Sequence, residues 1–422
     1  MEILDRFLQY VKINTQSDAS CNDFPSTKNQ KVLLGLLEKQ LLEMGLEATY
    51  KDGYTYALLK KNSLESFVSI GYIAHVDTSP DASGENIKPR LIKNYKGDVI
   101  KLNESISMSK EQYEDLSRVI GEDIVVTDGN TLLGADDKAG VTVIMEFIKY
   151  LVDHPSVPHG DIYICFTPDE EIGRGTDKID LKLFKPLFAY TLDGSEFGGI
   201  EYETFNAASA SIKINGKGIH PGSAKNKMVN ASRIAIEFDN MLDKEKRPEY
   251  TSGYDGFNHL VGMKTGVESG EIGYIIRNHD KKLFEEQKQS FFNIMNFINN
   301  KYKYKVLEVN IMDSYYNMAE LLQSHVEILD LARTAIRNTG IEPFSLPIRG
   351  GTDGARLTFM GLLTPNLGVG AYNFHGPYEF VSITQMEKAT KMLIEMTKLS
   401  RNFVTSLTKG LEWGKNEEVI ID

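Results

Sequence analysis

Apolar and polar positions in the first half of the chain alternate between helical and strand spacing. The stretch KVLLGLLEKQLLEMGL has apolar residues at helical spacing, whereas SFVSIGYIAHV and DIYICFTPDEE contain the short apolar runs of buried strands. A long helix with an apolar face, KAGVTVIMEFIKYLVDH, is expected from Lys138 after a glycine-rich turn. The N-terminus, MEILDRFLQYVKINTQSD, predicts an amphipathic helix. This alternation predicts an α/β layout around a largely buried sheet.

The pattern changes near FNAASASIKINGKG, where apolar and polar residues alternate as in a strand. A helix (NASRIAIEFDNMLDKE), two strands (GFNHLVGMK and GEIGYIIRNHD), a second helix (KLFEEQKQSFFNIMNFINN) and a last strand (KVLEVNIMDSYYNM) follow. This βαββαβ order predicts an α+β domain over residues 207–316, inserted between two parts of the larger domain, 1–206 and 317–422. After residue 317 the chain returns to helix–strand alternation.

Composition and charge narrow the class of protein. The chain has 422 residues, 41% hydrophobic and 25% charged, which is typical of a soluble globular protein of two or three compact units. Forty-seven basic residues against 59 acidic ones give a net charge of -12, so a nucleic-acid partner is disfavoured. No apolar run approaches the roughly 20 residues of a membrane span, and the N-terminus lacks a signal-peptide pattern. We therefore expect neither nucleic acid nor membrane as a partner.

The two cysteines, Cys21 and Cys165, are far apart, and the second lies inside an apolar run. A disulfide framework is therefore not expected, and the usage fits a reducing cytoplasm. Cys165 is interpreted as a packed core thiol.

Five short stretches place carboxylates or imidazoles at expected strand or loop ends, where open α/β folds build their sites. They are AHVDT with His75 and Asp77, LLGADDKAG with Asp136 and Asp137, TPDEEIGRG with Glu170 and Glu171, YTLDGS with Asp193, and NFHGPYE with His375. Each stretch alone has an ordinary explanation: a packed pair, a helix N-cap or a solvated turn. Their co-occurrence in one chain favours a shared site.

Imidazole and carboxylate ligands suit Zn²⁺, and a catalytic zinc site needs about three protein ligands with a position open for water. The five stretches supply enough ligands for two metal ions that share a bridging carboxylate.

HVDT, GADDKAG, PDEEIGRG, the DG after a strand and FHGPYE together resemble the zinc exopeptidases of the aminoacylase and carnosinase kind. The longer strings TLLGADDKAGV, ETFNAASASIKINGKGIHPGSAKNKMVNAS and RGGTDGARLTFMG resemble most closely the tripeptide aminopeptidases of that family. The resemblance covers essentially the whole chain, in order. It implies a catalytic domain with a mixed sheet flanked by helices, an inserted lid domain, and two Zn²⁺ per subunit, for which Co²⁺ or Mn²⁺ can substitute.

The resemblance also assigns roles to individual residues. His75 becomes a zinc ligand, and Asp77 becomes the carboxylate that holds its imidazole from the far side and fixes one tautomer. The family pattern Asp-x-Lys-x-Gly makes Asp136 the bridging ligand and leaves Asp137 a structural neighbour. Members of the family tend to have a cis peptide after the bridging aspartate.

For the remaining motifs, the resemblance makes Glu170 the general base and Glu171 a ligand of the second zinc. Asp193 joins His75 on one metal, and His375 joins Glu171 on the other. In this scheme Glu170 takes a proton from a water held between the metals, and the water's oxygen attacks the carbonyl of the first peptide bond.

Three further residues are candidates for contacts with the substrate. His220 in KGIHPGS resembles the family's lid histidine, which stabilises the oxyanion, although a surface-loop histidine is the alternative. Arg277 and Arg349 are candidates for the substrate's carboxylate, with structural salt bridges as the alternative. Glu196 departs from the more glycine-rich turn expected after Asp193, and it either alters how a substrate's ammonium group is received or faces solvent.

Five further histidines lie outside these motifs and are interpreted as ordinary loop or surface residues: His154, His159, His259, His279 and His325.

The sequence thus predicts a cytoplasmic two-zinc aminopeptidase that acts on small peptides and releases the N-terminal residue of tripeptides. A dipeptidase or N-acyl amino acid deacylase on the same scaffold is the first alternative, because it would share every metal ligand. A non-catalytic peptide-binding module is the second. Closure of the lid on substrate and a homodimer formed through the lid domain are further expectations.

Overall fold

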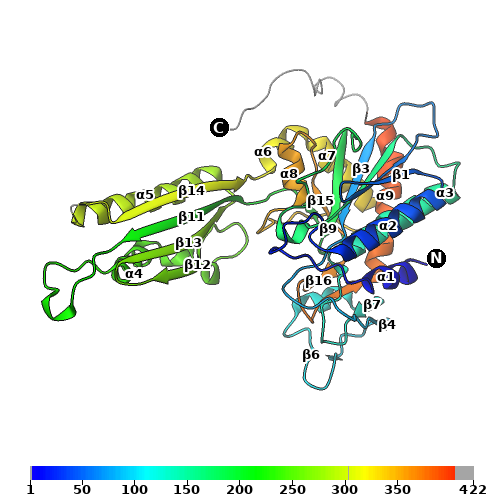
Figure 1. The fold of residues 1–422 in the computed structure, drawn as a ribbon. Coiled ribbons are helices and arrows are strands. Elements are labelled where there is room, and N and C mark those ends of the chain that lie inside the picture. The colour runs from blue at the N-terminus through cyan, green and yellow to red at the C-terminus, as the bar shows by residue number, and fades with distance from the viewer. Residues whose placement is uncertain (1, 303, 404–422) are drawn as a thin grey trace. The chain divides into compact units, whose positions relative to one another are not determined.

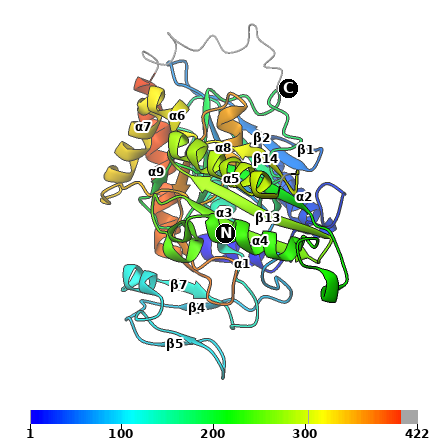
Figure 2. The same cartoon turned by 90° about the vertical axis from the view of Figure 1, so that its left-hand side faces the viewer.

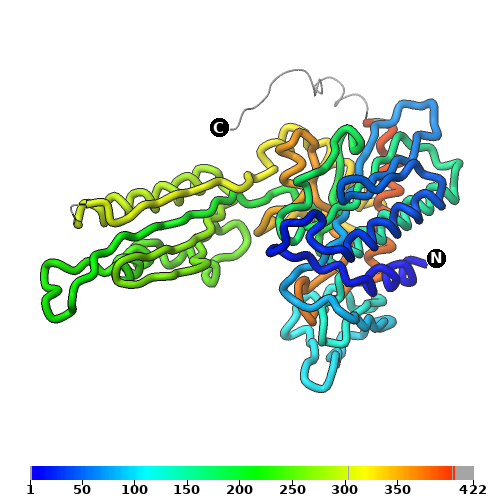
Figure 3. The backbone as a smooth tube through the Cα atoms, in the orientation of Figure 1, coloured from blue at the N-terminus to red at the C-terminus, as the bar shows by residue number. Residues whose placement is uncertain are grey.

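The computed structural model describes residues 2–302 and 304–403 of the 422. The chain forms two compact units, each with its own core. Unit 1 comprises Met1–Tyr202, Glu320–Ser345 and Thr352–Asp422, and unit 2 comprises Glu203–Ala319 and Leu346–Gly351. The backbone trace can be followed from unit 1 into unit 2 and back in Figure 3. The segment Leu346–Gly351 belongs to unit 2, which the sequence analysis does not anticipate.

A seven-stranded mixed sheet forms the centre of unit 1, in the order β1-β2-β8-β3-β9-β15-β10. The inner strands β8, β3, β9 and β15 run parallel, while β1, β2 and β10 pair antiparallel to their neighbours. The strands are β1 (Glu47–Lys51), β2 (Tyr54–Leu59), β3 (Ile70–His75), β8 (Ile162–Thr167), β9 (Phe188–Gly194), β10 (Ile200–Glu201) and β15 (Asn366–Gly368). The expectation of an α/β fold with a mixed sheet is confirmed.

Helices cover both faces of this sheet (Figure 1). On β3, the Tyr72 ring packs edge-on against Phe147 of α3 at 5.3 Å between centroids, while the next residue, Ile73, lies in a separate core cluster with Leu357 of α8. Successive side chains of a strand point to opposite faces, so both sides of β3 are buried. The helices are α1 (Ile3–Val11), α2 (Lys28–Glu43), α3 (Ala135–Asp153), α6 (Ala319–Leu322), α7 (Val326–Asn338), α8 (Asp353–Phe359) and α9 (Ile383–Leu399).

A smaller sheet in unit 1 was not predicted. Its four strands, in the order β16-β17-β7-β4, are β4 (Arg90–Ile92), β7 (Ile124–Val126), β16 (Ala371–Tyr372) and β17 (Phe380–Ser382). A separate hairpin pairs β5 (Ile100–Lys101) with β6 (Ser107–Met108). Strands of two or three residues are too short to give a recognisable alternation. Residues from β7, β17 and the hairpin nevertheless share one hydrophobic cluster.

Unit 2 has the expected βαββαβ order of elements. They are β11 (Asn206–Asn215), α4 (Ala231–Met241), β12 (Phe257–Thr265), β13 (Ser269–Asn278), α5 (Lys281–Tyr302) and β14 (Leu307–Tyr315). The four strands form an antiparallel sheet in the order β12-β13-β11-β14, and α4 and α5 pack on it and on each other (Figures 1 and 2). The alternation along β11 buries Ala208, Ala210 and Ile212 against the two helices.

Short 3-10 turns complete the described structure: η1 (Glu114–Val119), η2 (Glu170–Ile172), η3 (Pro221–Ser223), η4 (Lys244–Lys246), η5 (Pro248–Tyr250), η6 (Gln323–His325) and η7 (Ser400–Asn402). Cys165 on β8 is fully buried, as expected of a core thiol, and both cysteines are free. Among the described residues, no helix combines the length and apolar character needed to cross a bilayer.

Candidate metal centre

His75 is the last residue of β3 and lies at the edge of the sheet where the parallel strands end. Its Nε2 atom is 2.9 Å from Asp136 Oδ1 and 3.4 Å from Asp193 Oδ1, and the residue is only 2% exposed. Asp193 lies near the end of the neighbouring parallel strand β9. Two adjacent strand ends therefore bring an imidazole nitrogen and a carboxylate together, as the sequence predicted.

Asp77 joins two of the sequence motifs. Its Oδ1 atom is 3.3 Å from His75 Nδ1, and its carboxylate accepts hydrogen bonds from the backbone N–H of Glu170 at 3.0 Å and of Glu171 at 3.2 Å. His75 Nδ1 also lies 3.1 Å from the Asp77 carbonyl oxygen. A buried carboxylate thus faces the far side of the imidazole and fixes the start of the glutamate turn η2.

The turn before α3 places Asp136 between the two motif histidines. Gly134 has a left-handed backbone (φ 75°), the Asp136–Asp137 peptide is cis, and both aspartates have non-helical dihedral angles, so the regular helix begins at Lys138 as expected. Asp136 offers Oδ1 to His75 and Oδ2 to His375 Nε2 at 3.3 Å. One carboxylate thus contacts both imidazoles, which is the geometry of a bridging ligand.

Asp137 is oriented differently. Its Oδ2 atom accepts a hydrogen bond from the His75 backbone N–H at 3.2 Å, and its Oδ1 atom accepts one from the Gly140 N–H at 3.0 Å. Both oxygens are therefore committed to the backbone. This arrangement supports the structural role expected for Asp137.

The other side of the cluster is formed by Glu171 and His375. His375 Nε2 is 2.9 Å from Glu171 Oε2, and His375 has a left-handed backbone (φ 64°). Glu171 Oε1 is buried and has no hydrogen-bond partner among the described residues. A buried carboxylate oxygen without a partner is costly unless a cation or another donor satisfies it.

The pKa values of the site residues are shifted because several carboxylates lie close together in a buried place. Burial, together with the charge of Asp193, raises the pKa of Glu170 well above its ordinary range, and burial raises that of Asp193 to about 8. Hydrogen bonds with Asp136 and Glu171 raise the pKa of His375 to about 11. Burial opposes protonation of His75, but the Asp193 charge and the contact with Asp136 outweigh it, so its pKa also rises. The carboxylates therefore outnumber the positive charges of the cluster, and a bound cation would offset the excess negative charge.

The donor set fits divalent metal ions. Two imidazoles face a group of carboxylates, and the ligand atoms of His75, Asp136 and Glu171 lie within 4.8 Å of one another, as do those of His75, Asp137 and Asp193. Mixed nitrogen and oxygen ligands of this kind suit zinc and its neighbours. The unpartnered Glu171 oxygen points to the same conclusion. The geometry thus brings all seven predicted site residues of unit 1 together, and their individual roles remain predictions.

Sequence reasoning missed Glu379, which is 1% exposed and holds the aspartate turn in place. Its carboxylate accepts hydrogen bonds from the backbone N–H groups of Leu133 at 2.6 Å, Gly134 at 2.8 Å and Asp136 at 3.0 Å. Burial raises its pKa to about 7. The sequence does contain a pattern that could have indicated this residue, because Glu379 stands directly before a short apolar strand in the same stretch as His375.

Asn366 was missed as well. Its Oδ1 atom accepts a hydrogen bond from the Asp193 backbone N–H at 3.0 Å, and its Nδ2 donates to Glu201 Oε2 at 2.8 Å. This side chain therefore fixes the end of β9 where Asp193 leaves the sheet. A single asparagine in LTPNLGVGA gives no recognisable signal.

The predicted substrate-binding residues His220, Arg277 and Arg349 all lie in unit 2. His220 is exposed, and its Nδ1 accepts a hydrogen bond from the Gly222 N–H at 3.2 Å. Arg277 Nη1 donates to the Ile276 carbonyl at 3.0 Å, and Arg349 Nη1 donates to the Gly253 carbonyl at 2.8 Å. Both guanidiniums thus donate to backbone carbonyls of unit 2. Their binding of a substrate carboxylate stays a prediction.

Glu196 pairs with Arg118 of η1, which also lies 3.2 Å from Asp115. The Glu196 carboxylate thus has an arginine partner, so it neither faces solvent alone nor is free to receive a substrate's ammonium group.

Two of the five remaining histidines lie in loops, as expected, but they are buried and not exposed. His159 is 3% exposed, and its Nδ1 is 2.8 Å from the Gly160 carbonyl oxygen. His279 is 8% exposed and packs against Phe205 with 4.2 Å between ring centroids. His159 is held by the adjacent carbonyl and His279 by packing against a distant ring, and a single sequence does not distinguish such buried histidines from surface ones.

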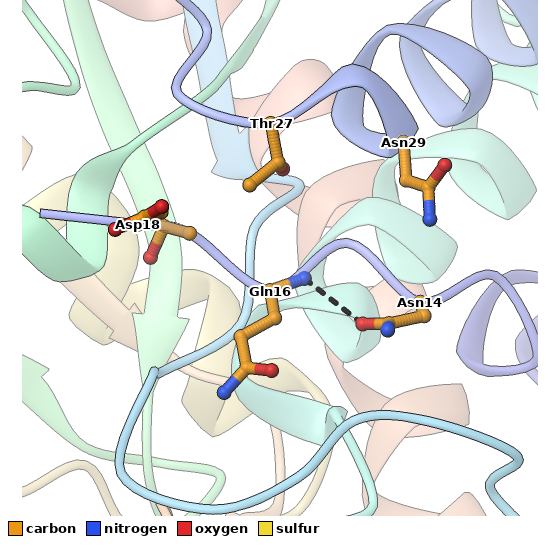
Figure 4. A pocket seen from close by; sticks show the side chains of 6 residues that line it. Asn14, Gln16, Asp18, Thr27 and Asn29 are labelled. Atoms are coloured by element: carbon orange, nitrogen blue, oxygen red, sulfur yellow. Dashed lines mark hydrogen bonds between the residues drawn. The ribbon is translucent and has the colours of Figure 1, made fainter. Parts of the chain in front are cut away.

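A polar pocket of about 380 Å³ lies beside the segment that follows Asp77 (Figure 4). Its lining side chains are mostly amides and hydroxyls, from Asn14, Gln16, Ser17, Asp18, Thr27 and Asn29. The backbone N–H of Ser17 donates to the Thr78 carbonyl at 3.1 Å, which attaches this wall to the strand end carrying Asp77.

Helices on both faces of a mixed sheet, with a histidine and carboxylate cluster at the strand ends, are typical of metal-dependent hydrolases. The model for peptidase family M20/M25/M40 matches residues 126–398, and the chain belongs to this family.

Within the family, the resemblance is to proteins named peptidase T. The chain is 49% identical over 402 residues to peptidase T of Caldanaerobacter subterraneus subspecies tengcongensis, covering 94% of this chain and 98% of the relative. It is 47% identical over 405 residues to peptidase T of Clostridium botulinum, covering 95% and 99%. The fold matches the crystal structure of aminopeptidase PepT from Bacillus cereus with a TM-score of 0.75 at 22% identity, covering 94% and 98% of the two chains.

Proposed function

We propose that this protein is a zinc-dependent aminopeptidase that releases the N-terminal residue from tripeptides in the cytoplasm. The observation that carries the proposal is the placement of Asp136 between His75 and His375, with Glu170 fixed next to the ligand Glu171. Near full-length similarity to proteins named peptidase T supports the choice of peptide hydrolysis and of tripeptides as the substrate class.

In the proposed site, His75, Asp136 and Asp193 would hold one metal ion, and Asp136, Glu171 and His375 would hold the other. Two bound Zn²⁺ ions would supply a Lewis acid for the substrate carbonyl and would lower the pKa of an attacking water. The unpartnered Glu171 oxygen and the crowding of carboxylates support this assignment, since a cation would relieve both.

Glu170 is the proposed general base. Burial and the charge of Asp193 raise its pKa well above that of an ordinary glutamate, and a more basic carboxylate is a stronger proton acceptor. Glu170 would take the proton from the attacking water and give it to the leaving amine. Its backbone N–H is held by Asp77, so the base and the ligand His75 depend on the same carboxylate.

The peptide itself is the proposed partner, and residues of unit 2 are proposed to contact it. An arginine fork matches a carboxylate, so Arg277 and Arg349 are the candidates for the C-terminal end of a tripeptide. His220 would stabilise the oxyanion. Lid closure would appear as a ligand-dependent change in small-angle scattering, and a homodimer through unit 2 would appear as twice the monomer mass in solution; an unchanged profile and a monomer mass would contradict them.

A dipeptidase or N-acyl amino acid deacylase would use the same metal ligands, so the substrate must decide between them. The test compares an unblocked tripeptide, its N-acetylated form and the matching dipeptide with zinc-loaded protein. Cleavage of the free tripeptide alone, with release of its first residue, is expected. Turnover of the dipeptide or of the acetylated peptide would replace the proposal with the sister activity, and no turnover would favour the peptide-binding module.

A further inference from the structure

His375 is the more exposed of the two motif histidines, and its imidazole lies between carboxylates on both sides. Its Nε2 atom faces Glu171 Oε2 at 2.9 Å and Asp136 Oδ2 at 3.3 Å, while its Nδ1 atom lies 3.3 Å from Asp81 Oδ2. His75 shows the same arrangement, with Asp77 at its Nδ1. No motif identified in the sequence gives Asp81 a role.

The difference in packing makes a partner at Nδ1 more important for His375. The side chain of His375 is 41% exposed, whereas that of His75 is 2% exposed. A buried ring is held in place by its neighbours, but a half-exposed ring must have its orientation and tautomer fixed by a hydrogen bond. The Asp81 carboxylate, whose side chain is 70% exposed, is the acid within ion-pair distance of Nδ1, while Nε2 faces Glu171 and Asp136.

Hydrogen bonds hold the backbone of the loop that contains Asp81. The Gln16 side chain donates to the carbonyl oxygens of Ser79 at 3.4 Å and Ala82 at 3.2 Å, on either side of Asp81. The Asp81 N–H donates to Ser79 Oγ at 3.3 Å. In Figure 4 the Gln16 side chain extends from the N-terminal segment towards the loop that contains these residues, while its backbone N–H donates to Asn14.

We propose that Asp81 is the positioning residue for His375, acting on the metal ion that Glu171 and His375 would share. A carboxylate at Nδ1 fixes the tautomer and increases the basicity of Nε2, and its loss typically costs 10- to 100-fold in metal affinity. The inference rests on the proposed metal site and adds to it a residue outside the metal ligands. It also gives Gln16 a function, because this side chain holds the Asp81 loop.

The test is a titration of metal-free protein with Co²⁺, followed by calorimetry and by the visible absorption of the bound ion. Wild type is expected to bind two ions. Asp81→Ala should weaken one of the two binding steps by about 10- to 100-fold and leave the other unchanged, and Asp81→Asn, which keeps an acceptor oxygen but loses the charge, should have a smaller effect. The matched control is Glu85→Gln, an exposed acid of the same segment, which should bind both ions like wild type.

Equal affinity of Asp81→Ala and wild type for both ions would overturn the proposal. So would a raised KM for a tripeptide with unchanged metal affinity, because Asp81 would then contact the peptide rather than position His375. If wild type itself bound no Co²⁺, the proposed metal site would fail, and this outcome is distinct from a failure of Asp81 alone.

Discussion

Asp77 Oδ1 accepts a hydrogen bond from the backbone N–H of Glu170 at 3.0 Å, and the same oxygen lies 3.3 Å from His75 Nδ1. One fully buried carboxylate therefore lies beside the ring of a candidate metal ligand and holds the backbone of the candidate base. This pairing explains why an aspartate follows two residues after the histidine at the end of a buried strand.

Replacing Asp77 with asparagine should disturb both partners at once. Both oxygens of the wild-type carboxylate are acceptors. In the variant, the NH2 group replaces one of them and must face a backbone N–H or the imidazole. We expect kcat/KM to fall by about 10- to 100-fold, with weaker binding of the metal shared by His75. Steady-state kinetics with metal analysis of the purified variant measure this. The surface variant Asp330→Asn on α7 serves as control, and wild-type activity in Asp77→Asn would contradict the coupling.

The adjacent aspartates of the α3 turn should respond differently to the same change. Asp136→Asn should lower the bound metal below two ions per chain, because Asp136 is the carboxylate that contacts both histidines. Asp137→Asn should keep two ions but lose about 1.5–3 kcal/mol of stability, because its NH2 group would face one of the two backbone N–H donors that the carboxylate now accepts from. Metal analysis and chemical denaturation separate the two effects. Two ions in Asp136→Asn would exclude it as the bridge.

The sequence predicted the parts of this site that lie on long, regular elements. β3 and β8 are continuous apolar runs, so their ends, and with them His75 and Glu170, could be placed without a structure. The different roles expected for Asp136 and Asp137 came from the family pattern, and the structure shows that both oxygens of Asp137 accept backbone hydrogen bonds.

Other parts could not be predicted because they depend on contacts between distant segments. Glu379 accepts hydrogen bonds from a turn near residue 134, and Asn366 holds the end of β9. Neither contact leaves a periodic pattern in the sequence. The small sheet was missed for a related reason, since β16 is only two residues long and is defined by its partner β17.

Glu201 should make stability depend on pH. Burial raises its pKa to about 7, whereas an unfolded glutamate titrates near 4.3. The unfolded state therefore releases this proton at lower pH than the folded state, so the free energy of unfolding should fall as the pH rises from about 4.3 to 7.

Glu201→Gln removes this dependence, while the amide oxygen can still accept the hydrogen bond from Asn366. The variant should be more stable than wild type at pH 8, by about 1–2 kcal/mol after allowance for partial exposure, and should lose this advantage at pH 4. Chemical denaturation at the two pH values provides the measurement. If the free energies of unfolding of variant and wild type differed by the same amount at pH 8 and pH 4, Glu201 would not titrate as stated.

The most direct test of the account is the hydrolysis of an unblocked tripeptide by zinc-loaded wild type and by Glu170→Gln prepared with the same metal content. The variant keeps the size of the side chain and its backbone contact with Asp77, but it cannot take a proton from water. We expect wild type to release the N-terminal residue and the variant to lose about 100- to 10,000-fold in kcat with two metal ions still bound. Comparable turnover by a fully metal-loaded variant would contradict the assignment of Glu170 as the base of a two-metal aminopeptidase.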